Sequence, residues 1–375
     1  MSPVPSVDVV CLGESMVTFV PSRPGRLADV PAFDRGIGGA ESNVACGLAR
    51  GGHSARWISR VGTDGFGDHL VAEIAATGVD VGCVQRDPRR PTGIYFRTAG
   101  ERAVGAGRGT EDDEAEGAEP LAEVVYYRAG SAAAAMSPAL VPREQAWSGR
   151  VLHLTGITPA LSDDCLALMR GLTARAPGRP LVSFDLNYRV SLWRDGAGER
   201  AEGRGPSVLL DLARGCDIVF VGEDEAEAAW GVRGAAAIRA ALPEPEALVV
   251  KQGGVGATAY ARRADGDDAV TFAPALRVDV VAPVGAGDAF AAGFLAGTLR
   301  GLPVAERLRH GHLMAAAALT VPGDLGTPPS RERADRLVAL DAAAWGTLRC
   351  GPGWTDLPNP AHPGAETVAV EVADS

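Results

Sequence analysis

The sequence contains a single lysine, Lys251, and arginine supplies the rest of its basic charge. The formal net charge is −11, and no lysine-rich tract or basic face interrupts this acidic background. Proteins that bind nucleic acids need basic patches to neutralise phosphates, so we expect no nucleic-acid partner. A lone lysine indicates a specific role at its position, although a solvated lysine beside glycines would give the same sequence.

Several other features are absent as well. The six cysteines are scattered, without the spacing of a disulfide framework or a metal site, which favours a reducing compartment. No segment reaches the ~18 uninterrupted apolar residues of a membrane span, and the N-terminus has no charged region followed by an apolar run. We therefore expect a cytoplasmic protein with no membrane partner.

The common nucleotide-binding fingerprints do not occur. There is no Gly-x-x-x-x-Gly-Lys-Ser/Thr loop, and no Gly-x-Gly-x-x-Gly follows a strand with an acidic partner downstream. A P-loop enzyme and a dinucleotide dehydrogenase are therefore both unsupported. What occurs instead is a glycine loop directly after a buried strand, Lys251-Gln-Gly-Gly-Val-Gly256. Open α/β sheets bind ligands at the carboxyl ends of their strands, although such glycines also make ordinary turns.

The order of apolar and amphipathic segments predicts an α/β fold. With 375 residues and 46% hydrophobic content, the chain can bury a large core. Short apolar strands alternate with helical patterns in the first third, where residues 79–85 are expected to be extended, and again from residue 151. This alternation is typical of a mostly parallel, doubly wound sheet flanked by helices. Residues 92–98 and 122–128 lack a helix between them and are expected to pair antiparallel.

Two segments have compositions that cannot build a core. Residues 101–120 combine glycines with an acidic cluster, and we expect a mobile, solvated loop rather than a metal site there. Residues 351–375 are rich in proline, glycine and acid and are expected to be a disordered or loosely attached tail. We interpret the pair His310-x-His312 as a feature of a helix surface rather than as a metal site.

The segment around residues 281–290 reads as a strand end, a glycine turn and a helix start. Gly285, Ala286 and Gly287 would direct backbone N–H groups and the helix dipole at an anion. Asp288 follows in the first helical turn, where aspartate is also an ordinary helix-start residue. An anion-binding turn beside a carboxylate is what a phosphoryl transferase needs, since it must stabilise charge and supply a base.

Taken with two distant motifs, the chain resembles the ribokinase-type carbohydrate kinases, also called the PfkB family. The motifs are Gly38-Gly-Ala-Glu-Ser-Asn43 and Val284-Gly-Ala-Gly-Asp-Ala-Phe290, and the resemblance covers roughly residues 7–340. It implies one α/β kinase domain over residues 1–345 and a small β-sheet lid from about 15–36 and 92–128. Lid strands are expected at residues 15–20, 32–36, 92–98 and 122–128. Asp288 would then be the catalytic base, with the turn at 285–287 as anion hole.

Within that family the likeness to 2-keto-3-deoxygluconate kinases rests on four segments of the chain. These are Gly13-Glu-Ser-Met16, Pro91-Thr-Gly-Ile-Tyr-Phe96, Tyr126-Tyr-Arg-Ala-Gly-Ser131 and Phe184-Asp-Leu-Asn-Tyr-Arg189. The resemblance implies that the substrate is bound by Gly38, Gly39, Asn43, Tyr95, Tyr126, Arg128 and Arg189. Two arginines in one pocket suit a carboxylate, although each of them could instead be a surface residue or the partner of a nearby acid.

The resemblance also assigns the nucleotide side. It implies ATP contacts at Lys251, Gly253, Gly256 and His312, and a water-mediated link from Glu225 to Mg²⁺. Two departures from the family pattern exist: Gly222 stands where many relatives have Asn, and Ala282-Pro283 stands where many have Asp-Thr. The first puts a phosphate contact in doubt, and the second makes a monovalent-cation site doubtful.

We expect an ATP-dependent kinase that phosphorylates the primary hydroxyl of 2-keto-3-deoxygluconate or a similar sugar acid. The alternatives are a neutral-sugar kinase of the same family, such as a fructokinase, and a catalytically silent ligand-binding relative. An exposed lid sheet also favours a homo-oligomer formed through the lid.

Overall fold

The computed structural model describes residues 6–23, 25–98, 123–194 and 205–356. The acidic segment 101–120 and the tail from residue 357 lie outside these ranges, so the expectations for them stay predictions. None of the helices in the described ranges is long and apolar enough to cross a membrane.

An eight-stranded sheet forms the centre of the molecule. Its strands are parallel, except that the two at one edge pair antiparallel with their neighbours. In spatial order its strands are β14 (Asp268–Pro274), β13 (Gly256–Arg262), β12 (Ala247–Lys251), β11 (Ile218–Gly222), β10 (Leu181–Asp185), β9 (Gly149–Thr155), β1 (Val7–Leu12) and β4 (Ala55–Ile58). The inner strands are nearly continuous apolar runs because helices cover both faces. This arrangement confirms the predicted doubly wound α/β class.

Alternate residues of each strand enter two separate cores. In β1, Val10 and Leu12 join one core while Val9 and Cys11 join the other. The first core is covered by α3 (Arg143–Ala146), α4 (Thr158–Leu161), α5 (Asp163–Thr173), α6 (Val190–Arg194), α7 (Ser207–Arg214), α8 (Glu223–Trp230) and α9 (Ala235–Ala241). The second is covered by α1 (Ala40–Arg50), α2 (Gly65–Ala76), α10 (Ala286–Leu299) and α11 (Val304–Leu319).

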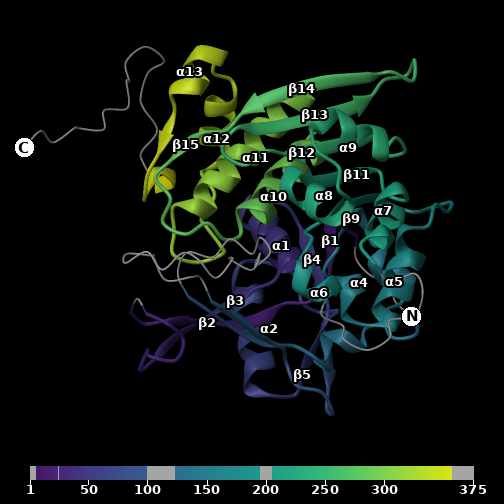
Figure 1. Cartoon of the computed structure of the whole chain (residues 1–375), viewed down its shortest axis with the longest axis vertical. Helices are drawn as coiled ribbons and strands as arrows, with labels where there is room; N and C mark the ends of the chain where they lie inside the picture. The colour runs from purple at the N-terminus through teal and green to yellow at the C-terminus, as the bar shows by residue number, and fades with distance from the viewer. Residues whose placement is uncertain (1–5, 24, 99–122, 195–204, 357–375) are drawn as a thin grey trace, which may run out of the picture.

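A four-stranded sheet, which we call the lid sheet, lies at the end of the molecule away from β12, β13 and β14 (Figure 1). Its spatial order is β3 (Phe33–Gly38), β2 (Met16–Pro21), β7 (Ile94–Arg97) and β8 (Val124–Tyr127). These strands fall within or next to the four runs expected to form the lid, and β7 pairs with β8 antiparallel as predicted.

The chain after α11 packs onto the main unit further than the sequence indicated. α12 (Arg331–Val338), α13 (Ala342–Thr347) and the pair β15 (Arg277–Val278) and β16 (Arg349–Cys350) surround a third apolar cluster. Trp345, Cys350 and Trp354 are buried in it, so the start of the expected tail is packed as far as Trp354.

One extended segment was predicted wrongly. Residues 79–84 do not form a strand, and β6 (Gln85–Asp87), which pairs with β5 (Arg60–Gly62), begins only at the last residue of the expected segment. Only an isolated bridge joins Asp80 to Arg56 of the edge strand β4. The Asp80 side chain accepts a hydrogen bond from the Gly82 N–H at 2.9 Å, which turns the chain away from the sheet edge.

Candidate active site

A cavity of about 280 Å³ opens at the carboxyl ends of the parallel strands, between the main sheet and the lid sheet. Strand order reverses between β1 and β9, which is where open α/β sheets place their ligands. The cavity brings together most of the residues that the sequence singled out, although they are far apart in the chain: Gly38, Gly39, Asn43, Tyr95, Tyr126, Arg128, Arg189, Glu225, Lys251, Gly285, Ala286, Gly287 and Asp288.

The glycine turn forms as predicted at the start of α10. Gly285 is the residue before the helix and has a left-handed φ of 69°. A Cβ atom there would lie 2.4 Å from the backbone oxygen of Asp324, so both the conformation and the space require glycine. The N–H groups of the first turn of α10 have no partner within the helix, and this end of the helix faces the cavity.

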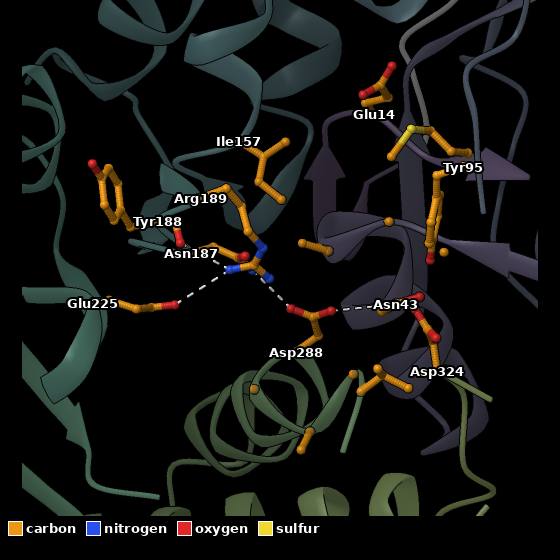
Figure 2. A pocket seen from close by; sticks show the side chains of 18 of the residues that line it. Glu14, Asn43, Tyr95, Ile157, Asn187, Tyr188, Arg189, Glu225, Asp288 and Asp324 are labelled. Carbon is orange, nitrogen blue, oxygen red and sulfur yellow. Dashed lines mark hydrogen bonds and ion pairs between the residues drawn. The ribbon is translucent and has the colours of Figure 1, made fainter. Parts of the chain in front are cut away.

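The Asp288 carboxylate is held by two amide side chains (Figure 2). Asn43 Nδ2 donates to Oδ2 at 2.9 Å, and Asn187 Nδ2 donates to Oδ1 at 3.2 Å. Asn187 itself has a φ of 41°, a left-handed conformation that non-glycine residues seldom adopt. The carboxylate is therefore fixed in orientation before any ligand arrives.

Burial raises the pKa of Asp288 from 3.8 to about 7. The Asn43 hydrogen bond opposes this rise, the Asp185 carboxylate adds to it, and Arg189 and Lys251 lower the pKa again. A carboxyl group that titrates near neutral pH can accept a proton far better than one titrating near 4. This arrangement is not that of an ordinary helix-start aspartate, which would be solvated.

Lys251 is engaged by an acid that the sequence reasoning did not assign. Its ammonium donates to both oxygens of Asp185, at 2.9 and 2.8 Å, and its side chain is 17% exposed. Burial lowers the pKa of Lys251, but Asp185 and Glu225 more than offset this and raise it, so the lysine stays charged. The alternative of a simply solvated lysine is therefore wrong.

Glu225 lies beside this pair in the first turn of α8. Its Oε2 accepts from the Gly222 N–H at 2.9 Å, and its Oε1 lies 3.8 Å from Nη1 of Arg189. Burial raises the pKa of Glu225, while Lys251 and Arg189 lower it in part. The glutamate thus caps its own helix and faces the cavity.

The two arginines that were expected to bind the substrate carboxylate already have acidic partners. Arg128 donates to Glu14, and Arg189 lies near Glu225 as described above. The two arginines line the same cavity, as the resemblance implied, but they do not stand as two unpaired charges. Their pairing weakens the argument that only an anion between them could offset their repulsion.

The lid side of the cavity contains a second ion pair. Nη2 of Arg97 donates to Oδ1 of Asp324 at 3.2 Å, and both side chains are largely buried. Burial raises the pKa of Asp324, which Arg97, Asn43 and Tyr95 each lower in part. Asp324 was not assigned from the sequence, because the loop after α11 carries no motif that marks it. Arg97 was expected only as part of a lid strand.

Three residues expected to bind ATP lie outside the lining of this cavity: Gly253, Gly256 and His312. His312 is buried, its Nε2 lies 3.1 Å from the Ala273 carbonyl oxygen, and burial lowers its pKa to about 4. His310 is buried too, so the helix-surface interpretation of this pair is wrong. The described residues contain no cluster of three or more metal-ligating side chains.

The two departures from the family pattern have clear positions. Gly222 precedes α8, and with no side chain it can offer a phosphate only its backbone. Ala282 is buried, and Pro283 lines the cavity. No carboxylate is therefore present at position 282 to hold a monovalent cation.

Comparison with known proteins identifies the family of the chain. Residues 7–331 match the model of the pfkB family carbohydrate kinases. The chain is 35% identical to a 2-dehydro-3-deoxygluconokinase of Bacillus subtilis (87% of this chain, 94% of that one) and 30% identical to a probable chloroplastic fructokinase-6 of Arabidopsis thaliana (86% and 80%). A PfkB protein from Polaromonas sp. JS666 superposes with a TM-score of 0.70 at 34% identity (88% and 99%). The chain belongs to the pfkB family of carbohydrate kinases.

Proposed function

We propose that the protein transfers the γ-phosphoryl group of ATP to the primary hydroxyl of 2-keto-3-deoxygluconate (2-dehydro-3-deoxygluconate) or a similar sugar acid. The observation that carries this proposal is the Asp288 carboxylate, fixed by two amides beside the glycine turn and facing a cavity that also contains Arg128 and Arg189. The similarity to the Bacillus subtilis 2-dehydro-3-deoxygluconokinase supports the choice of substrate. We also propose a cytoplasmic location, because ATP is available there.

In this mechanism Asp288 accepts the proton of the substrate hydroxyl as that oxygen bonds to the γ-phosphorus. The bond from the γ-phosphorus to the bridging oxygen breaks, and ADP leaves. Backbone N–H groups of Gly285, Ala286 and Gly287 stabilise charge on the transferring group. Lys251, whose Nζ would lie 3.4 Å from a Cβ atom placed on Gly287, adds a positive potential there. Arg128 and Arg189 hold the sugar carboxylate, and Tyr95 and Tyr126 bound the sugar on the lid side.

The residues present fit a Mg²⁺ ion that is bound mainly through phosphates. Mg²⁺ commonly takes one or two carboxylates and several waters in addition to phosphate oxygens, so a dedicated protein cage is not required. Glu225 would hold such an ion through water, as the resemblance implied. When bound, Mg²⁺ neutralises part of the phosphate charge.

A neutral-sugar kinase is the second candidate. Because Glu14 and Glu225 already pair with the two arginines, the cavity does not demand an anionic substrate. The similarity to the Arabidopsis fructokinase is also substantial. A catalytically silent binding protein is disfavoured, because the base and the glycine turn are both in place.

The direct test is ADP release from MgATP with a panel of sugars and sugar acids. We expect release with 2-keto-3-deoxygluconate and a product phosphorylated on the primary hydroxyl, detected by ³¹P NMR. Turnover of neutral sugars alone would establish the second candidate, and ligand binding without ADP release would establish a silent relative.

The raised pKa of Asp288 predicts the pH dependence. Below about pH 7 this carboxyl is protonated and cannot accept the hydroxyl proton, so kcat/KM should fall about tenfold per pH unit on the acid side. Above that pH the carboxylate is the main form and the rate should level off. A profile from pH 5 to 9 measures this, and a rate that stays constant down to pH 5 would contradict a base titrating near neutrality.

We further propose that the protein is a homo-oligomer through the outer face of the lid sheet. Aromatic side chains gather there: Phe96 stacks on Phe19 with ring centroids 4.9 Å apart and meets Phe33 and Tyr127 edge-on. Tyr127 is 61% exposed, and such aromatic surface commonly marks an interface.

Tyr127→Asp should therefore shift the protein from oligomer to monomer in sedimentation velocity at micromolar concentration, because a carboxylate would be buried without a partner. Val270→Asp is the matched control, since Val270 is also 61% exposed but lies on β14 of the main sheet. A parent protein that sediments as a monomer would refute this interface.

A further inference from the structure

Glu14 is a buried carboxylate between the main sheet and the lid sheet. It follows β1 in the chain and forms part of the cavity wall, with its side chain 0% exposed. Its Oε1 accepts a hydrogen bond from Ser131 Oγ at 2.7 Å, and its Oε2 accepts one from Nη2 of Arg128. Figure 2 shows Glu14 on the lid side near Tyr95 and away from Asp288, so it has no part in proton transfer.

The surroundings of Glu14 leave its side chain little freedom. A Cβ atom on Gly93 would lie 3.1 Å from Oε1 of Glu14 and 3.0 Å from Cγ of Met16. The close approach of the Gly93 backbone therefore encloses the carboxylate, and its position fixes the end of the Arg128 side chain.

Arg128 is held in place, but not all of its hydrogen-bond donors have an acceptor. Glu14 occupies Nη2, and the guanidinium carbon lies 5.5 Å from the centroid of the Tyr126 ring. Its Nε is buried and has no hydrogen-bond partner among the described residues. The guanidinium therefore has hydrogen-bonding capacity that Glu14 does not use.

We propose that Glu14 is a positioning residue for the substrate carboxylate and acts through Arg128. The proposal rests on the proposed function, since it takes Arg128 as a ligand of the sugar-acid carboxylate. A guanidinium held in one orientation loses less freedom when it binds, and its planar fork must match the plane of the carboxylate. Both hydrogen bonds of Glu14 come from the segment after β8, so its effect should fall on substrate binding rather than on turnover.

The test compares Glu14→Ala with Glu14→Gln by steady-state kinetics and by calorimetric titration with the sugar acid. Glu14→Ala should raise KM and Kd for the sugar acid about 10- to 100-fold, as loss of residues that orient a ligand-binding group does elsewhere, while kcat changes little. Glu14→Gln keeps one acceptor oxygen and should recover part of the affinity. MgATP affinity should be unchanged in both variants, which shows that the fold is retained.

A double-mutant cycle separates positioning from general damage. In an Arg128→Ala background, Glu14→Ala should add little further loss of sugar-acid affinity, because the group that it orients is gone. Asp268→Ala is the matched control, since Asp268 holds the buried Arg239 by hydrogen bonds of 2.6 and 2.7 Å outside the cavity lining. That variant should leave the KM for the sugar acid unchanged.

The proposal is overturned if Glu14→Ala leaves KM unchanged, or if its loss is equally large with and without Arg128. If Glu14→Ala does not fold, the same cycle with Glu14→Gln decides, because Gln nearly preserves the shape of the side chain. A parent enzyme that phosphorylates no sugar acid would instead refute the proposed function, and this outcome is visible before any variant is made.

Discussion

Asp288→Asn is expected to bind MgATP and the sugar acid while turning over about 10² to 10⁴ times more slowly than the parent enzyme. The amide has nearly the volume of the carboxylate and can still interact with Asn43 and Asn187, but it cannot accept the hydroxyl proton. Single-turnover kinetics with both substrates saturating measure the loss directly, and calorimetry checks that both affinities persist.

The stability of the same variant gives an independent check. Because the native pKa of Asp288 is raised above its unfolded value, the native state binds a proton more tightly, and the carboxyl destabilises the fold as pH rises from about 4 to 7. Asp288→Asn should therefore be at least as stable as the parent at pH 8, as measured by urea unfolding.

Asp68→Asn is the matched control, because Asp68 occupies the first turn of α2 and has a largely exposed side chain. That variant should retain full activity. Near-normal turnover of Asp288→Asn would remove Asp288 from the role of base and return it to that of a helix-start residue.

Arg189→Ala should raise the KM for the sugar acid by about tenfold to a hundredfold and leave that for fructose nearly unchanged. A hydrogen bond to a charged group contributes roughly 1.5–3 kcal/mol, and fructose lacks the carboxylate that would accept it. Since Arg189 also lowers the pKa of Asp288, its loss should raise that pKa. The comparison is therefore made at pH 8.5 or above, where the base stays ionised.

Arg150→Ala serves as the control, because the Arg150 side chain is 59% exposed and lies near the amino end of β9, outside the cavity lining. Equal increases in KM for the acidic and the neutral sugar after Arg189→Ala would mean that Arg189 shapes the cavity generally. The substrate would then be recognised by groups other than its carboxylate.

Much of the fold could be predicted from the sequence because its signals are local. Apolar runs such as Val7–Leu12 and Ile218–Gly222 are strands buried on both faces, and the glycine turn at 285–287 determines where α10 begins. The segment at residues 79–85 was mistaken for a strand, because its alternating valines resemble one while Asp80 turns the chain.

The site was predicted only as a set of positions, because its contacts join residues far apart in the chain. Asn43 was expected at the substrate hydroxyls and is seen donating to Asp288, across 245 residues of sequence. The pairing of Lys251 with Asp185 could not be predicted from either residue alone. The Asp in Phe184-Asp-Leu-Asn-Tyr-Arg189 was nevertheless visible, as a charge at the end of a buried strand.

The histidines show a further limit of sequence reasoning. His310 and His312 lie two positions apart on α11, and nothing in their spacing indicates that both are buried. Burial comes from the neighbours: α10 packs along α11, and Phe290 meets the His312 ring with centroids 5.2 Å apart. Tertiary packing of this kind leaves no local signal.

The most direct test of the account is a competition between 2-keto-3-deoxygluconate and fructose, at equal concentration, for limiting MgATP. The ratio of the two phosphorylated products gives the ratio of the two kcat/KM values without separate kinetic fits. The account predicts that the sugar-acid phosphate dominates by about a hundredfold, because two arginine contacts favour the carboxylate. Equal amounts of the two products, or an excess of fructose phosphate, would contradict it.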